Sequence, residues 1–148
     1  MPGFTTSFLF PDIDVWIALS HASHVHHLVA RHWFESLEDG VRFSFCRFTQ
    51  LGVLRLLSAE AVMGNDVLSQ REAWRVYDGW LSDDRVSLVD EPHGLESRLR
   101  PLTRSRRASP KAWADAYLVA FAETSQMTLV TFDRALHGKA KPVLLLAE

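Results

Sequence analysis

Three aspartates stand where the surrounding residues give a charged side chain no ordinary structural purpose. Asp12 and Asp133 each follow a short apolar run of the kind that forms a buried strand. Asp115 lies within the apolar stretch 112–122. Either of the first two, taken singly, could be a turn or helix-cap residue. Asp115 has no such explanation, because a helix that is apolar nearly all round is expected to be buried.

A buried, ionised carboxylate at Asp115 would cost several kcal/mol unless it is paired or bound to a metal ion. A structural ion pair with an arginine is one explanation, and it would account for Asp115 alone. A metal site would account for all three aspartates with one cause. Carboxylate oxygens favour magnesium or manganese over zinc. A cation of this kind can acidify a bound water and neutralise charge that develops on a phosphate.

The elements that must bring these residues together alternate along the chain. Apolar runs and alternating patterns predict strands, and residues at helical spacing predict the segments between them. Ser69 and Glu72 have the spacing of a capping box, and Ser109 followed by Pro110 is typical of a helix start. The expected strands are 7–10, 41–45, 86–89, 129–131 and 143–146; the expected helices are 24–37, 48–57, 69–81, 95–102 and 110–124.

Such alternation predicts an α/β fold of three layers, in which helices cover both faces of a mostly parallel sheet of four to five strands. Ligands bind outside the carboxyl ends of strands in such sheets, which is where Asp12 and Asp133 would stand. The length of 148 residues favours a single domain over residues 1–148.

Composition narrows the class of protein. Hydrophobic residues make up 47% and charged residues 23% of the chain, as expected of a packed soluble domain. The single cysteine, Cys46, excludes an internal disulfide and is expected to be a small buried side chain in a reducing, cytoplasmic setting. No secretory signal or membrane-spanning segment is expected. The net charge of −2 does not by itself indicate nucleic-acid binding.

Four motifs in chain order resemble those of one known family. The opening 8–19 has an aspartate after the first strand, and 45–52 falls where that family has a Thr-Glu pair. Asp115-Ala116-Tyr117-Leu118 and 129–133 carry two further acids. Each motif is weak alone, but four in sequence are specific. On these residues the chain resembles the PIN-domain ribonucleases of the VapC toxin type.

The resemblance implies a single PIN domain and a magnesium-dependent endoribonuclease, with manganese as a substitute ion. It also implies a toxin of a type II toxin–antitoxin system, a homodimer and a VapB-type antitoxin as partner. Carried over residue by residue, it implies that the catalytic positions are Asp12, Gln50, Asp115 and Asp133, and that Asp12 and Asp115 hold the metal.

One position departs from the family pattern, because Gln50 stands where a glutamate is usual. An amide can orient a water or a phosphate, but it adds no negative charge. We therefore expect the ion to be held mainly by Asp12 and Asp115. Asp14 could compensate if residues 12–14 continue the strand, since residues two apart in a strand point the same way. A helix that starts at Ile13 would remove that argument.

Several weaker signals accompany the acids. A basic stretch precedes Asp115, and we expect Arg104, Arg106, Arg107 and Lys111 to contact RNA, with Arg98 and Arg100 nearby. Five of the seven histidines fall between His21 and His32; a polar helix start is the more ordinary reading than a zinc site at His24 and His27. Trp74 and Trp80 are expected in the core or in a dimer interface.

Two rival functions stay open. Asp12-Ile13-Asp14 after a strand resembles the acid pair of a haloacid-dehalogenase-type phosphatase, although that family has small and polar residues after the pair and a double acid late in the chain. Val15-Trp16-Ile17 and the single Asp133 argue against it. The second rival, motivated by Gln50, is a PIN module that binds RNA or an antitoxin without efficient cleavage.

Overall fold

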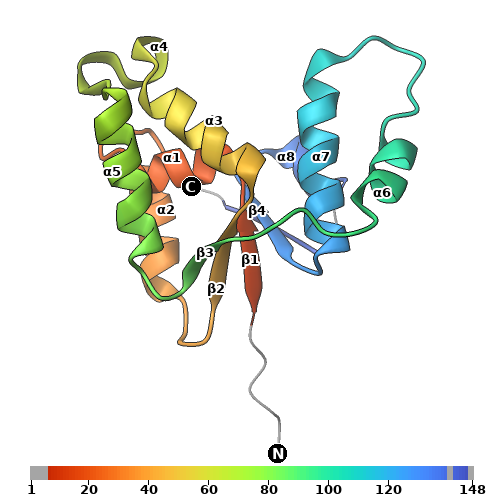
Figure 1. The fold of residues 1–148 in the computed structure, drawn as a ribbon, viewed down its shortest axis with the longest axis horizontal. Coiled ribbons are helices and arrows are strands. Elements are labelled where there is room, and N and C mark those ends of the chain that lie inside the picture. The colour runs from red at the N-terminus through yellow and green to blue at the C-terminus, as the bar shows by residue number, and fades with distance from the viewer. Residues whose placement is uncertain (1–6, 140–141, 147–148) are drawn as a thin grey trace, which may run out of the picture.

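The computed structural model describes residues 7–139 and 142–146, which form a five-stranded sheet in the order β3-β2-β1-β4-β5 (Figure 1). Every pairing in this sheet is parallel. The strands are β1 (Phe8–Pro11), β2 (Arg42–Phe45), β3 (Val86–Leu88), β4 (Thr128–Thr131) and β5 (Val143–Leu145). The central position of β1 places the segment that follows it, which begins with Asp12, between the ends of β2 and β4.

The connections are helical, as parallel pairing requires. They are α1 (Ile13–Ser20), α2 (His27–Ser36), α3 (Arg47–Leu57), α4 (Glu60–Met63), the 3-10 turn η1 (Gly64–Asp66), α5 (Gln70–Leu81), α6 (Leu95–Leu102), α7 (Pro110–Thr124) and α8 (Arg134–His137). None of the helices in the described part of the chain is both long and apolar enough to cross a membrane.

The sheet separates two hydrophobic cores because successive residues of a strand point to opposite faces. Leu9 of β1 and Val130 of β4 join the core that includes residues of α1, α2, α3 and α5. Phe10 and Leu129, their neighbours in sequence, join the core formed with α6 and α7. The helices of the two cores accordingly lie on opposite sides of the sheet (Figure 1). The three-layer α/β/α arrangement expected from the sequence is confirmed.

Local signals predicted several boundaries well. Helix α6 spans Leu95–Leu102 and α7 spans Pro110–Thr124, as expected, and all five strands lie within one residue of their expected bounds. The capping box of α5 is present: Glu72 N donates to Ser69 Oγ at 3.1 Å, and Ser69 N donates to Glu72 Oε1 at 3.0 Å. Ser109 precedes α7, but its side chain makes no capping hydrogen bond.

The start of α2 was predicted wrongly, and α1 and the short elements α4, η1 and α8 were not predicted. Helix α2 begins at His27 rather than at residue 24. The preceding residues form turns instead, in which His24 N donates to His21 O and His27 N donates to His24 O. Helix α1 was not predicted as an element. Its residues Val15 to Leu19 are all buried, so the segment has no polar face and lacks the periodicity that identifies a half-buried helix. Trp80 packs against the core as expected, whereas Trp74 is 46% exposed.

The contact between α1 and α3 holds the start of α1 in place, and it predicts opposite effects for two glycine substitutions. A Cβ at Gly52 of α3 would lie 2.3 Å from Ile13 Cδ1, whereas a Cβ at Gly79 of α5 would meet nothing within 4 Å. Gly52→Ala should lower the free energy of unfolding by about 1–3 kcal/mol through overpacking, less the gain in helix propensity. Gly79→Ala should raise it by roughly 0.5–1 kcal/mol.

Denaturant unfolding of both variants checks this prediction. Ile13→Val removes the Cδ1 methyl group that the added Cβ would strike, so it should stabilise the Gly52→Ala protein although it weakens the wild type by about 0.5–1.5 kcal/mol. Equal losses from Ile13→Val in both backgrounds would contradict the proposed clash.

Candidate active site

Asp12 lies at the carboxyl end of β1 and caps the N-terminus of α1, and both of its carboxylate oxygens have a donor. Oδ1 accepts from Val15 N at 3.0 Å, and Oδ2 accepts from the hydroxyl of Thr131 at 2.5 Å. The backbone N–H of Asp12 donates to Val130 O at 2.9 Å, which continues the pairing of β1 with β4. The side chain is only 7% exposed, so the carboxylate is held by neighbouring groups rather than by bulk water.

Burial raises the pKa of Asp12 from 3.8 to about 6. The hydrogen bonds from Thr131 and Val15 act in the opposite direction, and the negative charges of Asp14 and Asp133 add to the rise. The carboxylate is therefore a charged group in a place that disfavours charge. A nearby cation would relieve that cost.

Asp133 is joined to Asp12 through one hydroxyl group. Thr131 Oγ1 donates to Asp12 and accepts from the backbone N–H of Asp133 at 3.0 Å. Asp133 caps α8, its Oδ1 accepting from Ala135 N at 2.8 Å, and Lys111 Nζ approaches its Oδ2 at 3.3 Å. The Ala135 N–H, and then Lys111, hold the pKa of this partly exposed carboxyl below its usual value.

Asp115 points from α7 and is 9% exposed. Within residues 7–139 and 142–146, its carboxylate has no hydrogen bond and no ion pair, so the arginine salt bridge considered from the sequence is not found there. Lys111 lies one helical turn earlier, and Asp133 and then Asp115 raise the pKa of that lysine. Lys111 thus links Asp115 to the pair formed by Asp12 and Asp133.

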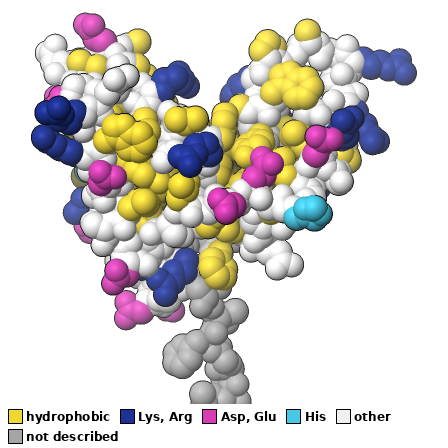
Figure 2. Space-filling view, in the orientation of Figure 1, with side chains coloured by type: hydrophobic (Ala, Val, Ile, Leu, Met, Phe, Trp, Pro, Cys, Tyr) yellow, Lys and Arg dark blue, Asp and Glu magenta, His cyan; other side chains and the backbone are white. Residues whose placement is uncertain are grey.

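These contacts place Asp12 and Asp133 at the carboxyl ends of β1 and β4, and Lys111 is the residue that connects Asp115 to them. The molecule is hollowed there into a V-shaped notch between the part built by α3 and α5 and the part built by α6 and α7 (Figure 2). Among the described residues, no three His, Cys, Asp or Glu side chains are close enough together to enclose a metal ion. The donor set nonetheless suits a hard cation, because carboxylate oxygens predominate; the ammonium of Lys111 balances part of their charge at Asp133.

Gln50 is placed differently from the aspartates. It lies in the first turn of α3, after β2, and is 3% exposed. Its Oε1 accepts from Arg47 Nη1 at 2.5 Å, and no hydrogen bond in the described chain joins it to the three aspartates. The amide oxygen is thus already engaged by a positive charge from its own helix.

The proposed compensation by Asp14 is wrong, because the strand ends before it. Helix α1 begins at Ile13, which puts Asp14 in its first turn. Asp14 Oδ1 instead pairs with His24 Nε2 at 3.1 Å. His27 Nδ1 bonds to Ala18 O at 2.7 Å, so His24 and His27 are each engaged separately and form no shared site.

The basic stretch divides into paired and unpaired members. Arg98 pairs with Glu123, and Arg100 pairs with Glu96. Lys111 lies at Asp133. The other three, Arg104, Arg106 and Arg107, are exposed in the loop between α6 and α7, and no ion pair involves them in the part of the chain that is described.

Comparison with known proteins decides the family. The family model described as "PIN domain" matches residues 9–142. The chain is also 42% identical over 131 residues to Ribonuclease VapC41 of Mycobacterium tuberculosis, covering 86% of this chain and 90% of the relative. The chain belongs to the PIN-domain family of VapC ribonucleases.

Solved structures agree with the fold. VapC20 of Mycobacterium tuberculosis, described as a toxin that cleaves the sarcin–ricin loop, superposes with a TM-score of 0.63 at 19% identity, covering 88% of this chain and 93% of that one. VapBC2 of Rickettsia felis, bound to a DNA fragment from its promoter, superposes with a TM-score of 0.66 at 11% identity, covering 93% and 96%. The resemblance stated from four sequence motifs is therefore confirmed.

Two residues of this PIN domain's acidic site were not assigned there from the sequence. Thr131 was noted only as part of a strand, although its place two residues before Asp133 puts both side chains on one face. Lys111 was assigned to RNA, whereas its ammonium lies at Asp133. Its position four residues before Asp115, one helical turn away, was the available signal.

The raised pKa of Asp12 predicts how stability changes with pH in metal-free protein. Neutral Asp12 favours the fold, so this stabilisation is fully present below pH about 4 and is lost as the pH rises through about 6. Asp12→Asn should therefore stabilise the protein at pH 7 and above, by on the order of 1–3 kcal/mol, and the gain should vanish near pH 4. Denaturant unfolding in EDTA at several pH values measures it.

Asp133→Asn is the matched control with the opposite sign. Its pKa is lowered in the fold, so its stabilisation is present at neutral pH and is lost on acidification. The substitution should weaken the protein at pH 7. Destabilisation of the same size by both variants would show that the Asp12 charge is not a burden on the fold.

Proposed function

We propose that this VapC-family chain is the toxin of a type II toxin–antitoxin pair and cleaves RNA as a metal-dependent endoribonuclease. The observation that carries the proposal is the acidic site, in which Thr131 joins Asp12 to Asp133 while Asp115 lacks a partner in the described chain. The 42% identity to Ribonuclease VapC41 supports the same activity.

Asp12 and Asp115 are the residues that would hold the metal ion. We propose Mg²⁺, with Mn²⁺ able to substitute, because both prefer oxygen ligands. When bound, such an ion acidifies water and neutralises charge on the phosphate. Thr131 and Val15 N fix the orientation of the Asp12 carboxylate, so its oxygens do not have to be ordered when a ligand arrives.

The other polar residues have separate proposed roles. Asp133, held by Ala135 N and Lys111, adds negative charge that helps to position a water. Gln50 can orient the phosphate or the water through its amide, with Arg47 supplying a positive charge beside it. Arg104, Arg106 and Arg107 would contact RNA phosphates outside the site.

Partners follow from the proposed role. A solved structure of similar fold, from Klebsiella pneumoniae, is described as a toxin–antitoxin complex, and we propose that this chain binds a VapB-type antitoxin. We further propose that the chain forms a homodimer, that residues 1–148 make one PIN domain, and that the protein acts in the cytoplasm.

Metal-dependent cleavage is the direct test of the proposed activity. Wild-type protein should cut a labelled RNA only when Mg²⁺ or Mn²⁺ is supplied, and Asp12→Asn or Asp115→Asn should reduce the rate by roughly 100-fold or more, on the order expected when charge stabilisation of the transition state is lost. The same preparations are offered a small phosphate ester. Hydrolysis of the ester without cleavage of RNA would favour the phosphatase over the nuclease.

Toxicity tests the biological role. Expression of the chain alone should arrest bacterial growth, and Asp12→Asn should relieve the arrest while the protein accumulates and stays folded. Circular dichroism of the purified variant serves as the folding control. Equal arrest by the two proteins would remove the nuclease mechanism.

The alternative of a module that binds without efficient cleavage is motivated by Gln50, and Gln50→Glu tests it. A further carboxylate near the ion should lower the metal concentration for half-maximal cleavage by about tenfold. Arg47 would pair with this new carboxylate, so the single variant should shift less than Gln50→Glu combined with Arg47→Met. Arg47→Met alone is the control. A double variant with the wild-type metal dependence would show that position 50 does not serve the ion.

A further inference from the structure

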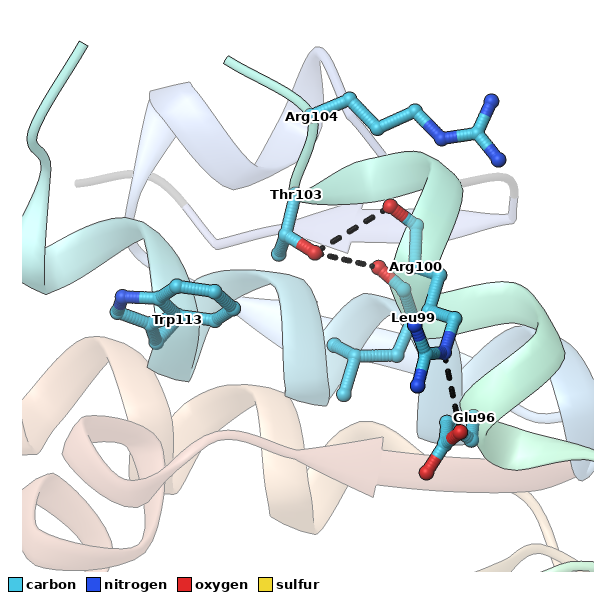
Figure 3. A pocket seen from close by; sticks show the side chains of 6 residues that line it. All are labelled: Glu96, Leu99, Arg100, Thr103, Arg104 and Trp113. Atoms are coloured by element: carbon cyan, nitrogen blue, oxygen red, sulfur yellow. Dashed lines mark hydrogen bonds and ion pairs between the residues drawn. The ribbon is translucent and has the colours of Figure 1, made fainter. Parts of the chain in front are cut away.

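A second hollow lies between α6 and α7; its lining comes from α6, from the two residues that follow it and from Trp113 of α7. It has a volume of about 500 Å³, within the range of roughly 300–1,000 Å³ typical of ligand sites. Figure 3 shows the indole of Trp113, on α7, facing the side chain of Leu99, on α6, across this space. Thr103 points into it from the end of α6, and Arg104 extends from its rim (Figure 3).

Trp113 is the unusual residue of this hollow because it is 60% exposed. The other aromatic side chains of α7 are engaged: Tyr117 packs on Phe48 at 5.3 Å between ring centroids, and Phe121 stacks on Phe10 at 4.8 Å. Trp113 has no ring contact and no hydrogen bond through its Nε1 in the part of the chain that is described. One broad aromatic face is therefore free to accept a planar group.

The charges beside the hollow favour an anionic ligand. Glu96, the acid in its lining, is already paired with Arg100 at 3.0 Å. The adjoining loop 103–109 contains Arg104, Arg106 and Arg107 and no acidic residue. All three arginines are exposed and unpaired within the described residues, so the net charge next to Trp113 is positive.

The hollow and the acidic site share helix α7. Trp113 precedes Asp115 by two residues on α7, so the two side chains leave the helix in roughly opposite directions. Lys111, one turn before Asp115 and on the same face of α7, stands at the start of the helix. A single strand that passes from the aspartates over the beginning of α7 would meet Lys111 first, and then Trp113 and the arginines.

We propose that the α6–α7 hollow is a nucleobase subsite for single-stranded RNA, with one base stacked on Trp113 and the neighbouring phosphates bound by Arg104, Arg106 and Arg107. This rests on the proposed ribonuclease function and names where its substrate is held. Aromatic stacking accepts any base, because every base has a π face, so the subsite would position the strand rather than read its sequence.

A second exposed tryptophan shows why RNA is the occupant proposed for this hollow. The hollow at Trp74, between α3 and α5, is bordered by Leu51 and Leu54, with Arg55 as its one cation among the described residues. Leu51 is 55% exposed there, so that surface is an extended apolar face suited to a protein partner. The Trp113 hollow has one exposed ring with Arg104 in its lining, and Arg106 and Arg107 follow in the adjoining loop, which holds no acid; this combination suits a base flanked by phosphates.

The test is binding of a fluorescein-labelled single-stranded RNA decamer in EDTA, followed by anisotropy so that no cleavage intervenes. Trp113→Ala should weaken binding about tenfold, because one base loses the aromatic ring on which it stacks. Trp113→Phe should keep most of the affinity, and Trp74→Ala should leave it unchanged. Arg104→Ala should reduce the salt dependence by about 0.7 in log–log slope, whereas Trp113→Ala should not.

Abasic substitution locates the base. Each nucleotide of the decamer in turn is replaced by an abasic one, and binding to wild type and to Trp113→Ala is compared. At one position, or at two adjacent ones, loss of the base should weaken wild type about tenfold and the variant hardly at all. If the loss from removing a base and the loss from Trp113→Ala are additive at every position, the proposal is overturned. A base that stacks on Trp113 can lose that interaction only once, so the two losses must be coupled.

Two further measurements separate this proposal from its rivals and from the ribonuclease function. If Trp113→Ala changes the molar mass found by light scattering and leaves RNA affinity intact, the hollow is a contact between copies and the proposal fails. Wild-type cleavage with Mg²⁺ is measured in parallel. If wild type cleaves RNA but Trp113→Ala binds RNA as tightly as wild type, only the subsite is overturned. If the abasic and Trp113→Ala losses are coupled but wild type does not cleave RNA, the ribonuclease function is overturned and the subsite is supported.

Discussion

A buried carboxylate at the end of the central strand is the constraint on which the site depends. Asp12 is 7% exposed and is held by Val15 N and by the Thr131 hydroxyl. Those two donors do not compensate its burial fully, since its pKa stays at about 6. The fold therefore holds the Asp12 carboxylate in a position where its negative charge is unfavourable, and a bound cation would relieve that cost. Asp133, joined to it through the same hydroxyl, adds to that unfavourable charge rather than relieving it.

The arrangement of layers explains how one helix can serve both the site and the outer surface. Helix α7 covers one face of the sheet, with Val119, Ala120 and Phe121 fully buried. Its N-terminal half extends beyond that core beside the notch (Figure 1). There Asp115 is buried toward the aspartates, while Trp113 remains 60% exposed toward α6. Two residues of separation on a helix are enough to direct these side chains to different sides.

The chemistry at the site also weakens the phosphatase reading. Asp14, which would be the second acid of such an enzyme, pairs with His24 in the first turn of α1. Asp12 is instead connected to Asp133, the acid that follows the neighbouring strand β4. Gln50, which stands where the family usually has a glutamate, accepts a hydrogen bond from Arg47. An arginine beside an amide supplies charge of the opposite sign to a glutamate, so the surroundings of Gln50 are better suited to a phosphate than to a cation.

The sequence by itself determined what depends on near neighbours: the strands, the limits of α6 and α7, the capping box of α5 and the order of the four family motifs. It also singled out Asp115, because a charge in an apolar helix is visible without a structure. Tertiary structure decided the partners. Thr131 reaches Asp12 across 119 positions only because β1 lies beside β4, and Lys111 reaches Asp133 only because α7 packs near the end of β4. The pattern of apolar and polar residues within one strand does not indicate which other strand pairs with it. Contacts between residues far apart in the sequence are therefore decided by the packing of the whole sheet.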